Sequence, residues 1–337
     1  MSKKKFLFYF NTPGWGGNEI MALSIMKEVV RCEKIVEIIC SAEQKQKFIK
    51  MDNFDKISFL NDKVINYEEY EKIIIILPSF LSSLKMISEY NLFFNDKVYL
   101  YAPFWGWEWS KKNSVIFRKY FLSVFLFFTK IKILAIRHDF EKNIIRDSEN
   151  RVLIIPNYAT KEFHCYESNE KNLYCIGRVD FSQKGQDELL KALIKLKQKK
   201  FNFFDKLIFI GDGPDLKKLM KLSESYEWVE FSPWISSGEI RISNKSICIL
   251  ASHYEGLPLT ALEAIMSNIP VIATRNSALN SILPRECLHQ NDSISLEKAI
   301  NYTFSNYSRI LVYCKSKVTK GYTYSSFSES IKKFCRD

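Results

Sequence analysis

The chain of 337 residues lacks several features that mark common classes of protein. Its eight cysteines occur singly, with no C-x-x-C pair and no metal-ligand spacing, and only four histidines accompany them. We therefore expect reduced thiols, a cytoplasmic protein and no structural zinc. No uncharged apolar stretch reaches the length of about 18 residues that spanning a membrane requires, so we expect no membrane-spanning segment.

Two further signatures are missing near the start of the chain. The apolar run Phe6–Phe10 is too short for a signal peptide, and no small-residue cleavage site follows it. The glycine-rich stretch from Asn11 to Gly17 lacks G-x-G-x-x-G, which excludes the dinucleotide fingerprint. Glycines there still let the backbone approach a ligand closely, although a tight turn between strand and helix explains them equally well.

Length and composition favour two domains. A chain of 337 residues is long for a single core, and 47% apolar residues can supply two. The formal net charge of +11 indicates an anionic partner, which could be nucleic acid, a membrane surface or a phosphorylated substrate.

Short apolar runs alternate with helical patterns along the chain, which predicts doubly wound parallel sheets. In the first half we expect a helix over Glu19–Arg31 and strands over Lys5–Phe10, Val36–Cys40, Lys72–Leu77, Lys97–Tyr101 and Ile131–Ile136. In the second half we expect a helix over Asp187–Lys199 and strands over Leu173–Ile176, Lys206–Ile210, Cys248–Ala251 and Val271–Thr274.

The stretch from Cys248 to Thr274 reads as strand, loop, helix and strand. Pro258 suits the first helical position, and Asn268 can end the helix in the left-handed conformation. Glu263 falls on the apolar helix face, where a carboxylate needs a partner, and Glu255 lies beside the helix N-terminus, which suits a phosphate. The alternatives are that Glu255 caps the helix and that Glu263 reaches solvent.

Glu255-x7-Glu263, written EGLPLTALEA, resembles the signature of retaining glycosyltransferases of family 4, which have the GT-B fold. Three further matches follow the family order: Gly16-Gly17-Asn18-Glu19, Gly177-Arg178 with Lys184-Gly185, and Gly211-Asp212-Gly213-Pro214. The resemblance is clear over residues 152–275. It implies two Rossmann-like domains facing across a cleft. We expect an acceptor domain over 1–155, a nucleotide-sugar domain over 156–320, and a closing helix in 321–337 that returns to the first domain.

The resemblance implies catalytic roles for Arg178, Lys184 and Glu255. The two cations would stabilise the β-phosphate of a nucleotide-diphosphate sugar, and Glu255 would hold sugar hydroxyls. The remaining donor contacts it implies are Gly16, Gly17, Ile235, Gly256, Leu257, Leu259, Thr260 and Glu263, the last on the ribose. We expect no cofactor and no metal, because Asp212 and Asp215 do not form an Asp-x-Asp motif. We favour a UDP-sugar over a GDP-sugar.

The acceptor side departs from the family pattern. Where the family usually has a histidine, this chain reads Ala102-Pro-Phe-Trp-Gly-Trp-Glu-Trp109, and His138 does not align with that position. Trp105, Trp107 and Glu108 could form an acceptor wall on which a sugar stacks, or the aromatics could be ordinary packing.

Residues 110–137 carry seven basic side chains and no acid, against a net charge of +6 for residues 1–155. The segment is also rich in phenylalanine. A basic aromatic helix of this kind suits an anionic membrane surface, which we expect at about 110–130. The alternative is a core helix with a solvated basic end.

These observations predict a cytoplasmic, peripheral membrane, metal-independent retaining hexosyltransferase-like enzyme. It would act on a lipid-linked or glycan acceptor in lipopolysaccharide, O-antigen or related surface-polysaccharide synthesis. One alternative is a GT-B sugar-nucleotide epimerase, which would need acid/base groups not evident in the sequence. The other is a basic nucleic-acid-binding protein, for which no recognised module appears. We expect no nucleic-acid partner.

Overall fold

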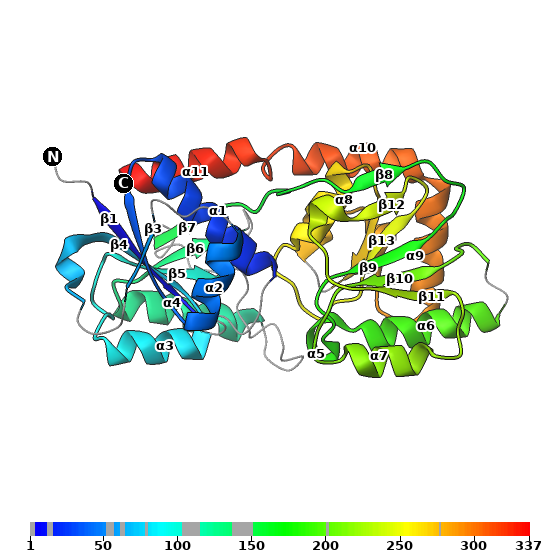
Figure 1. Ribbon diagram of the computed structural model, residues 1–337, viewed down its shortest axis with the longest axis horizontal. Coiled ribbons are helices and arrows are strands. Elements are labelled where there is room, and N and C mark those ends of the chain that lie inside the picture. Colours follow the sequence, from blue (N-terminus) through cyan, green and yellow to red (C-terminus); the bar gives the residue numbers. More distant parts are fainter. Residues whose placement is uncertain are drawn as a thin grey trace. The chain divides into compact units, whose positions relative to one another are not determined.

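A computed structural model describes residues 4–11, 16–51, 57–60, 65–77, 80–102, 115–136, 151–199, 202–275 and 278–337. The chain divides into two compact units (Figure 1). Unit 1 comprises Met1–Asn157 and Ser325–Asp337, and unit 2 comprises Tyr158–Tyr324. The unit boundaries lie at 157/158 and 324/325, where 155/156 and 320/321 were expected, and the last segment of the chain belongs to unit 1.

Unit 1 is built on a seven-stranded parallel sheet of order β3-β2-β1-β4-β5-β6-β7. Its strands are nearly continuous apolar runs, as expected for a sheet covered on both faces. The strands are β1 (Lys5–Phe10), β2 (Ile35–Cys40), β3 (Ile57–Phe59), β4 (Tyr70–Ile76), β5 (Val98–Ala102), β6 (Lys132–Ala135) and β7 (Val152–Ile154).

Helices cover both faces of this sheet (Figure 1). They are α1 (Gly17–Arg31), α2 (Ala42–Met51), α3 (Phe80–Glu89), α4 (Val115–Phe128) and α11 (Tyr324–Arg336). On one face, the ring of Phe6 packs on Phe334 of α11 with centroids 5.7 Å apart. Helix α11 also reaches α1, where the Ser328 hydroxyl donates to Glu28 at 2.5 Å. The opposite face packs a cluster that includes Ile87 of α3.

Unit 2 is built on a six-stranded parallel sheet of order β11-β10-β9-β13-β14-β15. Its strands are β9 (Leu173–Ile176), β10 (Leu207–Ile210), β11 (Val229–Ser232), β13 (Ile247–Leu250), β14 (Val271–Thr274) and β15 (Leu288–His289). A small parallel pair joins β8 (His164–Tyr166) to β12 (Arg241–Ser243). The helices are α5 (Phe181–Lys184), α6 (Gln186–Gln198), α7 (Leu216–Ser223), α8 (Leu259–Met266), α9 (Ser293–Ser305) and α10 (Tyr307–Val318).

The strand order places a topological switch point in each unit. In unit 2 the chain builds β9, β10 and β11 outward in one direction and then returns to place β13 on the other side of β9. In unit 1 the corresponding neighbours are β1 and β4. Ligands of open α/β sheets bind outside the carboxyl ends of the strands at such points. A ligand is therefore expected to bind beside the loops that follow β1, β9 and β13.

The expected strands and helices are present, with end shifts of a residue or two. Asn268 adopts the predicted left-handed conformation, with φ of 62°. Pro258 differs from expectation: it precedes the helix as its N-cap, and α8 begins at Leu259. A short 3-10 turn at Ser237–Glu239 lies between β11 and β12. Short strands β3, β7, β8, β12 and β15 were not predicted, because runs of two or three residues carry too little periodicity.

Two further expectations concerned reduced thiols and the absence of a membrane-spanning segment. All eight cysteines are free, and five of them are buried. Within the described part of the chain, no helix combines the length and the apolar composition that crossing a membrane requires.

Candidate functional site

The switch point of unit 2 brings together two loops that lie far apart in the sequence. Strands β9 and β13 are hydrogen-bonded neighbours, so the segments after Ile176 and Leu250 leave the same edge of the sheet. The first carries Arg178 and Lys184, and the second carries Glu255. The three residues predicted to be catalytic therefore come from the two loops at this edge.

Lys184 and Glu255 form an ion pair, in which the ammonium group donates to the carboxylate Oε1. The Ser252 hydroxyl donates to the same oxygen at 2.9 Å. Glu255 is 7% exposed, so its charge is held in a largely desolvated position by these partners. A buried carboxylate with a cation and a hydroxyl beside it satisfies the requirement that buried charges be paired.

Gly185 makes this pairing possible. It ends the short helix α5 with φ of 61°, a left-handed conformation that glycine adopts without strain. A Cβ atom at this position would lie 2.5 Å from the backbone oxygen of Ala251. Glycine is therefore required because the two loops touch directly behind Lys184, and His253 N–H donates to Gln183 O at 2.8 Å beside the contact.

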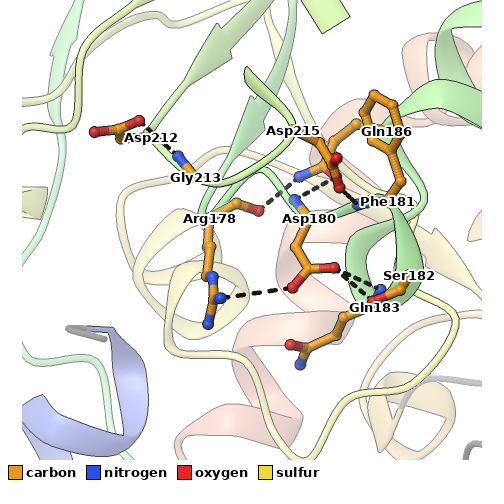
Figure 2. Close-up of polar contacts among 9 residues, drawn as sticks. All are labelled: Arg178, Asp180, Phe181, Ser182, Gln183, Gln186, Asp212, Gly213 and Asp215. Atoms are coloured by element: carbon orange, nitrogen blue, oxygen red, sulfur yellow. Dashed lines mark hydrogen bonds and ion pairs between the residues drawn. The ribbon is translucent and has the colours of Figure 1, made fainter. Parts of the chain in front are cut away.

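The Arg178 side chain is more exposed and less closely paired than that of Lys184. Its guanidinium lies 3.7 Å from the Asp180 carboxylate, and its side chain is 45% exposed (Figure 2). Asp180 caps α5 by accepting from Gln183 N–H at 3.3 Å, and the Ser182 hydroxyl donates to it at 2.6 Å. The backbone of Arg178 is fixed by Gln186, whose side-chain amide donates to its carbonyl at 2.7 Å. A fixed backbone with an exposed fork suits an anion-binding arginine.

The loop Gly211–Pro214 supports the Arg178 segment from behind. A Cβ atom on Gly211 would lie 2.1 Å from Gly177 O, and one on Gly213 would lie 2.2 Å from Val179 O. Asp215 accepts from Phe181 N–H at 3.0 Å, which ties the start of α7 to α5 (Figure 2). The glycines of this loop thus allow two backbones to pack closely, and this contact is their structural role.

Glu263 is buried in α8, with an exposure of 2%. Its carboxylate accepts from the Thr160 hydroxyl at 2.5 Å and from the Ser237 hydroxyl at 2.9 Å. Burial raises the pKa of this carboxyl, while the hydrogen bonds from Thr160 and Ser237 act in the opposite direction. The expectation that Glu263 lies on the apolar side of the helix and needs a partner is confirmed. The partners found here are protein hydroxyls from two other segments.

The other predicted donor residues lie in both units. Gly256, Leu257 and Leu259 are buried around the start of α8, and Thr260 and Ile235 are partly exposed. Gly16 is the N-cap of α1 in unit 1, and Gly17 is the first residue of that helix. The predicted acceptor residues Trp105, Trp107 and Glu108 lie outside the described residues, as does His138.

Several polar residues around the Glu255 loop were not predicted. The Asn291 side-chain amide donates to Ala251 O at 2.7 Å, and the Thr274 hydroxyl donates to Ser252 O at 2.5 Å. Thr274 ends β14, the neighbour of β13, and Asn291 follows β15, the next strand of the sheet, and both hydrogen-bond to the loop that holds Glu255. Thr274, at the end of the predicted strand Val271–Thr274, was a signal available in the sequence, but only the strand order shows that this end lies beside the Glu255 loop. Asn291 gave no signal, because β15 was not predicted.

Among the residues that the structure describes, no three His, Cys, Asp or Glu side chains form a group that could hold a metal ion. Arg178 and Lys184 offer cations that can neutralise an anion, and the carboxylates of the site can accept hydrogen bonds from hydroxyl groups. Both fit a phosphorylated sugar.

Comparison with known proteins gives the class of this chain. Residues 157–309, nearly all of unit 2, match the family model described as Glycosyl transferases group 1. An uncharacterized glycosyltransferase of Haemophilus influenzae is 30% identical over 119 residues, which are 35% of this chain and 33% of that protein. The chain thus aligns with about a third of the length of that curated relative.

Solved structures match over the whole chain. The lipopolysaccharide outer core galactosyltransferase WaaB in its apo form has a TM-score of 0.60 at 17% identity, covering 99% of this chain and 100% of that one. Anabaena HepE, solved with UDP and glucose, has a TM-score of 0.68 at 12% identity, covering 99% and 100%. The chain therefore has the GT-B fold, and residues 157–309 of its second unit resemble group 1 glycosyl transferases. The predicted GT-B fold and the resemblance to glycosyltransferases are confirmed, and the retaining mode stays a prediction.

Proposed function

We propose that this protein transfers a sugar from a nucleotide-diphosphate sugar to a glycan or lipid-linked acceptor. The observation that carries the proposal is the convergence of Arg178, Lys184 and Glu255 at the switch point of a group 1 glycosyl transferase domain. Two cations and a carboxylate at this position match what a departing nucleoside diphosphate and a bound sugar require.

The chain's own groups would divide the work as follows. Arg178, with its exposed guanidinium, and Lys184 would bind the β-phosphate and stabilise its growing charge as the glycosidic bond breaks. Backbone amides at Leu259 and Thr260, in the first turn of α8, would add to that anion site. Glu255 would hold donor-sugar hydroxyls, and Gly16 and Gly17 would approach the phosphates from unit 1.

Glu263 would accept a ribose hydroxyl in addition to its present partners. A carboxylate offers about four acceptor positions, and Thr160 and Ser237 use two of them. The ribose would therefore complete a network that already joins α8 to the start of unit 2 and to the Ser237–Glu239 turn.

We propose a retaining, same-face attack, because the described site offers no carboxylate placed as a nucleophile apart from the paired Glu255. The leaving phosphate would help to take the acceptor's proton. We favour a UDP-sugar donor and a role in lipopolysaccharide or O-antigen synthesis. HepE was solved with UDP and glucose, and WaaB is named for the lipopolysaccharide core, which supports both choices.

A peripheral contact with an anionic membrane, on the inner face of the cytoplasmic membrane, is part of the proposal. Val124, Phe127 and Phe128 of α4 are 51%, 76% and 67% exposed. Phe125 packs on the unit 1 core and is not available for insertion. Phe127 and Phe128 are exposed at the end of α4, close to the exposed Lys130, so the insertion would rest on them.

The test is a screen of nucleotides and nucleotide sugars, with binding measured by thermal shift and turnover by release of the free nucleotide. We expect UDP and at least one UDP-sugar to raise the melting temperature and slow sugar release to be detectable. No shift and no release with any UDP-, GDP- or ADP-sugar would overturn the proposal.

The comparisons favour neither alternative. An epimerase would convert the sugar while it remains a nucleotide sugar, which product analysis of the same reactions would detect. A nucleic-acid-binding protein would lose sugar-nucleotide binding in the presence of competitor DNA or RNA.

A further inference from the structure

The first turn of α1 in unit 1 holds a buried carboxylate, that of Glu19, which takes no part in the proposed mechanism. Glu19 is 7% exposed. Its Oε2 lies 3.5 Å from where a Cβ atom on Gly16 would stand, so the carboxylate folds back over the glycine that begins the helix. The Gly16 N-cap receives no side-chain cap hydrogen bond. Among the described residues, Glu19 has neither an ion pair nor a side-chain hydrogen bond.

A buried hydroxyl stands at the same end of the same sheet. Tyr101, near the carboxyl end of β5, is 6% exposed, and its hydroxyl oxygen is buried without a hydrogen-bond partner among the described residues. Burial raises the pKa of this phenol, and the nearby negative charge of Glu19 raises it further.

The register of β5 places Tyr101 on the α1 face. Alternate residues of a strand share a face, so Tyr101 lies on the same side as Tyr99. The Tyr99 ring packs on Phe334 of α11 with centroids 5.0 Å apart, and α11 is bonded to α1 through Ser328 and Glu28. The hydroxyl of Tyr101 and the carboxylate of Glu19 therefore belong to one layer at the carboxyl edge of the sheet, beside the β1–β4 switch point.

This pair has the chemistry of a hydroxyl-binding site. A buried phenol without a partner lacks an acceptor, and an ionised carboxylate accepts but cannot donate. A sugar hydroxyl meets both needs at once, because it can accept from Tyr101 and donate to Glu19. Buried polar groups without partners are rare, and a ligand that completes their bonds is a physical reason for keeping them.

We infer that Glu19 and Tyr101 form a subsite for a hydroxyl of the acceptor sugar. The inference rests on the proposed function. The acceptor sugar is indicated because the pair holds a carboxylate and no cation, which suits a neutral sugar hydroxyl and would repel the donor diphosphate. The hydroxyls of the donor sugar are already assigned to Glu255 in the proposed function.

The test compares Glu19→Gln and Tyr101→Phe with wild type. Sugar release from the UDP-sugar to water is measured first. Transfer to a panel of octyl glucoside, octyl galactoside and octyl N-acetylglucosaminide is then measured. We expect the ratio of transfer to hydrolysis to fall about tenfold in Glu19→Gln, as for loss of a hydrogen bond to a charged group. Tyr101→Phe should lower it less, and both effects should lie in the KM for the glycoside.

Glu43→Gln on the exposed part of α2 and Tyr313→Phe on α10 are matched controls that should leave the ratio unchanged. Thermal unfolding gives a readout that needs no acceptor. Removing a phenol oxygen without a partner should leave the melting temperature unchanged or raise it, whereas removing a structural hydrogen bond should lower it by several degrees.

Three results would overturn the inference: an unchanged ratio in Glu19→Gln, an equal loss of hydrolysis and transfer, or a clearly lower melting temperature in Tyr101→Phe. If no glycoside accepts a sugar, the unfolding comparison alone decides. If the wild-type protein released no sugar from any nucleotide sugar, that result would instead contradict the proposed function.

Discussion

The ammonium group of Lys184 and the carboxylate of Glu255, 71 residues apart in the chain, are hydrogen-bonded to each other. The Lys184 ammonium group, which we propose as a phosphate ligand, is thus paired with a carboxylate in the structure. An ammonium group has three donors, so Lys184 can keep Glu255 and still offer a hydrogen bond to a phosphate oxygen. The pair would also orient Glu255 toward the sugar while the phosphate is bound.

The first prediction concerns this clamp. Arg178→Ala or Lys184→Ala should lower turnover by about 10²–10³, because each removes one donor to charge that develops in the transition state. Steady-state release of nucleotide measures this loss. Lys191→Ala, which removes an exposed lysine of α6, is the matched control. Turnover like that of wild type in a well-folded Arg178 or Lys184 variant would remove these residues from the mechanism.

A double-mutant cycle measures the interaction energy between Lys184 and Glu255 separately from the effect of each single substitution. Lys184→Ala leaves Glu255 buried with Ser252 as its remaining side-chain partner, so that variant should unfold more easily than wild type. Adding Glu255→Gln removes the unpaired charge and should recover part of the loss, with a coupling of about 1–3 kcal/mol. Additive effects on unfolding would show that the ion pair has no energetic weight.

The second prediction divides the roles of the two glutamates. Glu263→Ala should weaken binding of free UDP, and it should also destabilise unit 2 because the Thr160 and Ser237 hydroxyls lose their acceptor. Glu255→Gln should leave UDP binding nearly unchanged and reduce transfer. Calorimetry with UDP checks both.

Thr160→Val shows whether the protein contacts alone explain the effect of Glu263. It removes one of these contacts and keeps the carboxylate, so it should weaken UDP binding less than Glu263→Ala does. Equal losses of affinity in the Glu255 and Glu263 variants would contradict the division of roles.

The third prediction concerns metal ions. If Arg178 and Lys184 neutralise the leaving diphosphate, transfer should persist in excess EDTA. Activity with and without the chelator, measured on protein dialysed beforehand, provides the comparison. Complete loss in EDTA that Mg²⁺ or Mn²⁺ restores would mean that the diphosphate is held by a metal.

The fourth prediction concerns α4. Liposome sedimentation should show binding to anionic vesicles, no binding to neutral ones, and weakening at high salt, because each cation near the surface contributes about 1 kcal/mol. Replacing Phe127 and Phe128 with Ser, or Lys111, Lys112, Arg118 and Lys119 with Ser, should abolish sedimentation and spare hydrolysis of the donor. Ile49→Ser removes an exposed apolar residue of α2 and is the control. Sedimentation of both sets of variants like wild type would place the contact elsewhere.

The fifth prediction concerns acid. His289 is fully buried in β15, and burial lowers its pKa from 6.5 to about 4. Between these values the unfolded chain binds a proton that the folded chain does not, so stability falls as pH drops from 6.5 toward 4. The contribution is about 3 kcal/mol at 1.36 kcal/mol per pKa unit.

Chemical denaturation at several pH values checks the role of His289. His289→Gln should unfold with a shallower dependence on pH in this range, whereas His164→Gln, at an exposed position, should keep the slope of wild type. An identical slope in His289→Gln and wild type would show that another group causes the acid sensitivity.

Local sequence patterns were sufficient for much of the architecture. The isoleucine run of β4 and the apolar run before Ser252 can only be buried strands, and the helix between Pro258 and Asn268 carries its own start and stop signals. The position of Glu263 on the buried side of α8 likewise follows from helical periodicity. The partners of Glu263 could not be predicted, because Thr160 lies in an irregular segment and Ser237 in a single 3-10 turn, and neither has a periodic pattern.

The sequence by itself determined that this is a two-domain α/β protein of GT-B type, since strand and helix alternation and the motif residues are local properties. Only the tertiary structure decided which residues meet. Lys184 reaches Glu255 because β9 and β13 are neighbours and because Gly185 lets their loops touch. Tyr101 shares a layer with Glu19 because the register of β5 turns it toward α1. Both arrangements depend on strand order and on the sheet face that a side chain occupies. Packing over the whole sheet sets these two properties, and no short stretch of sequence encodes them.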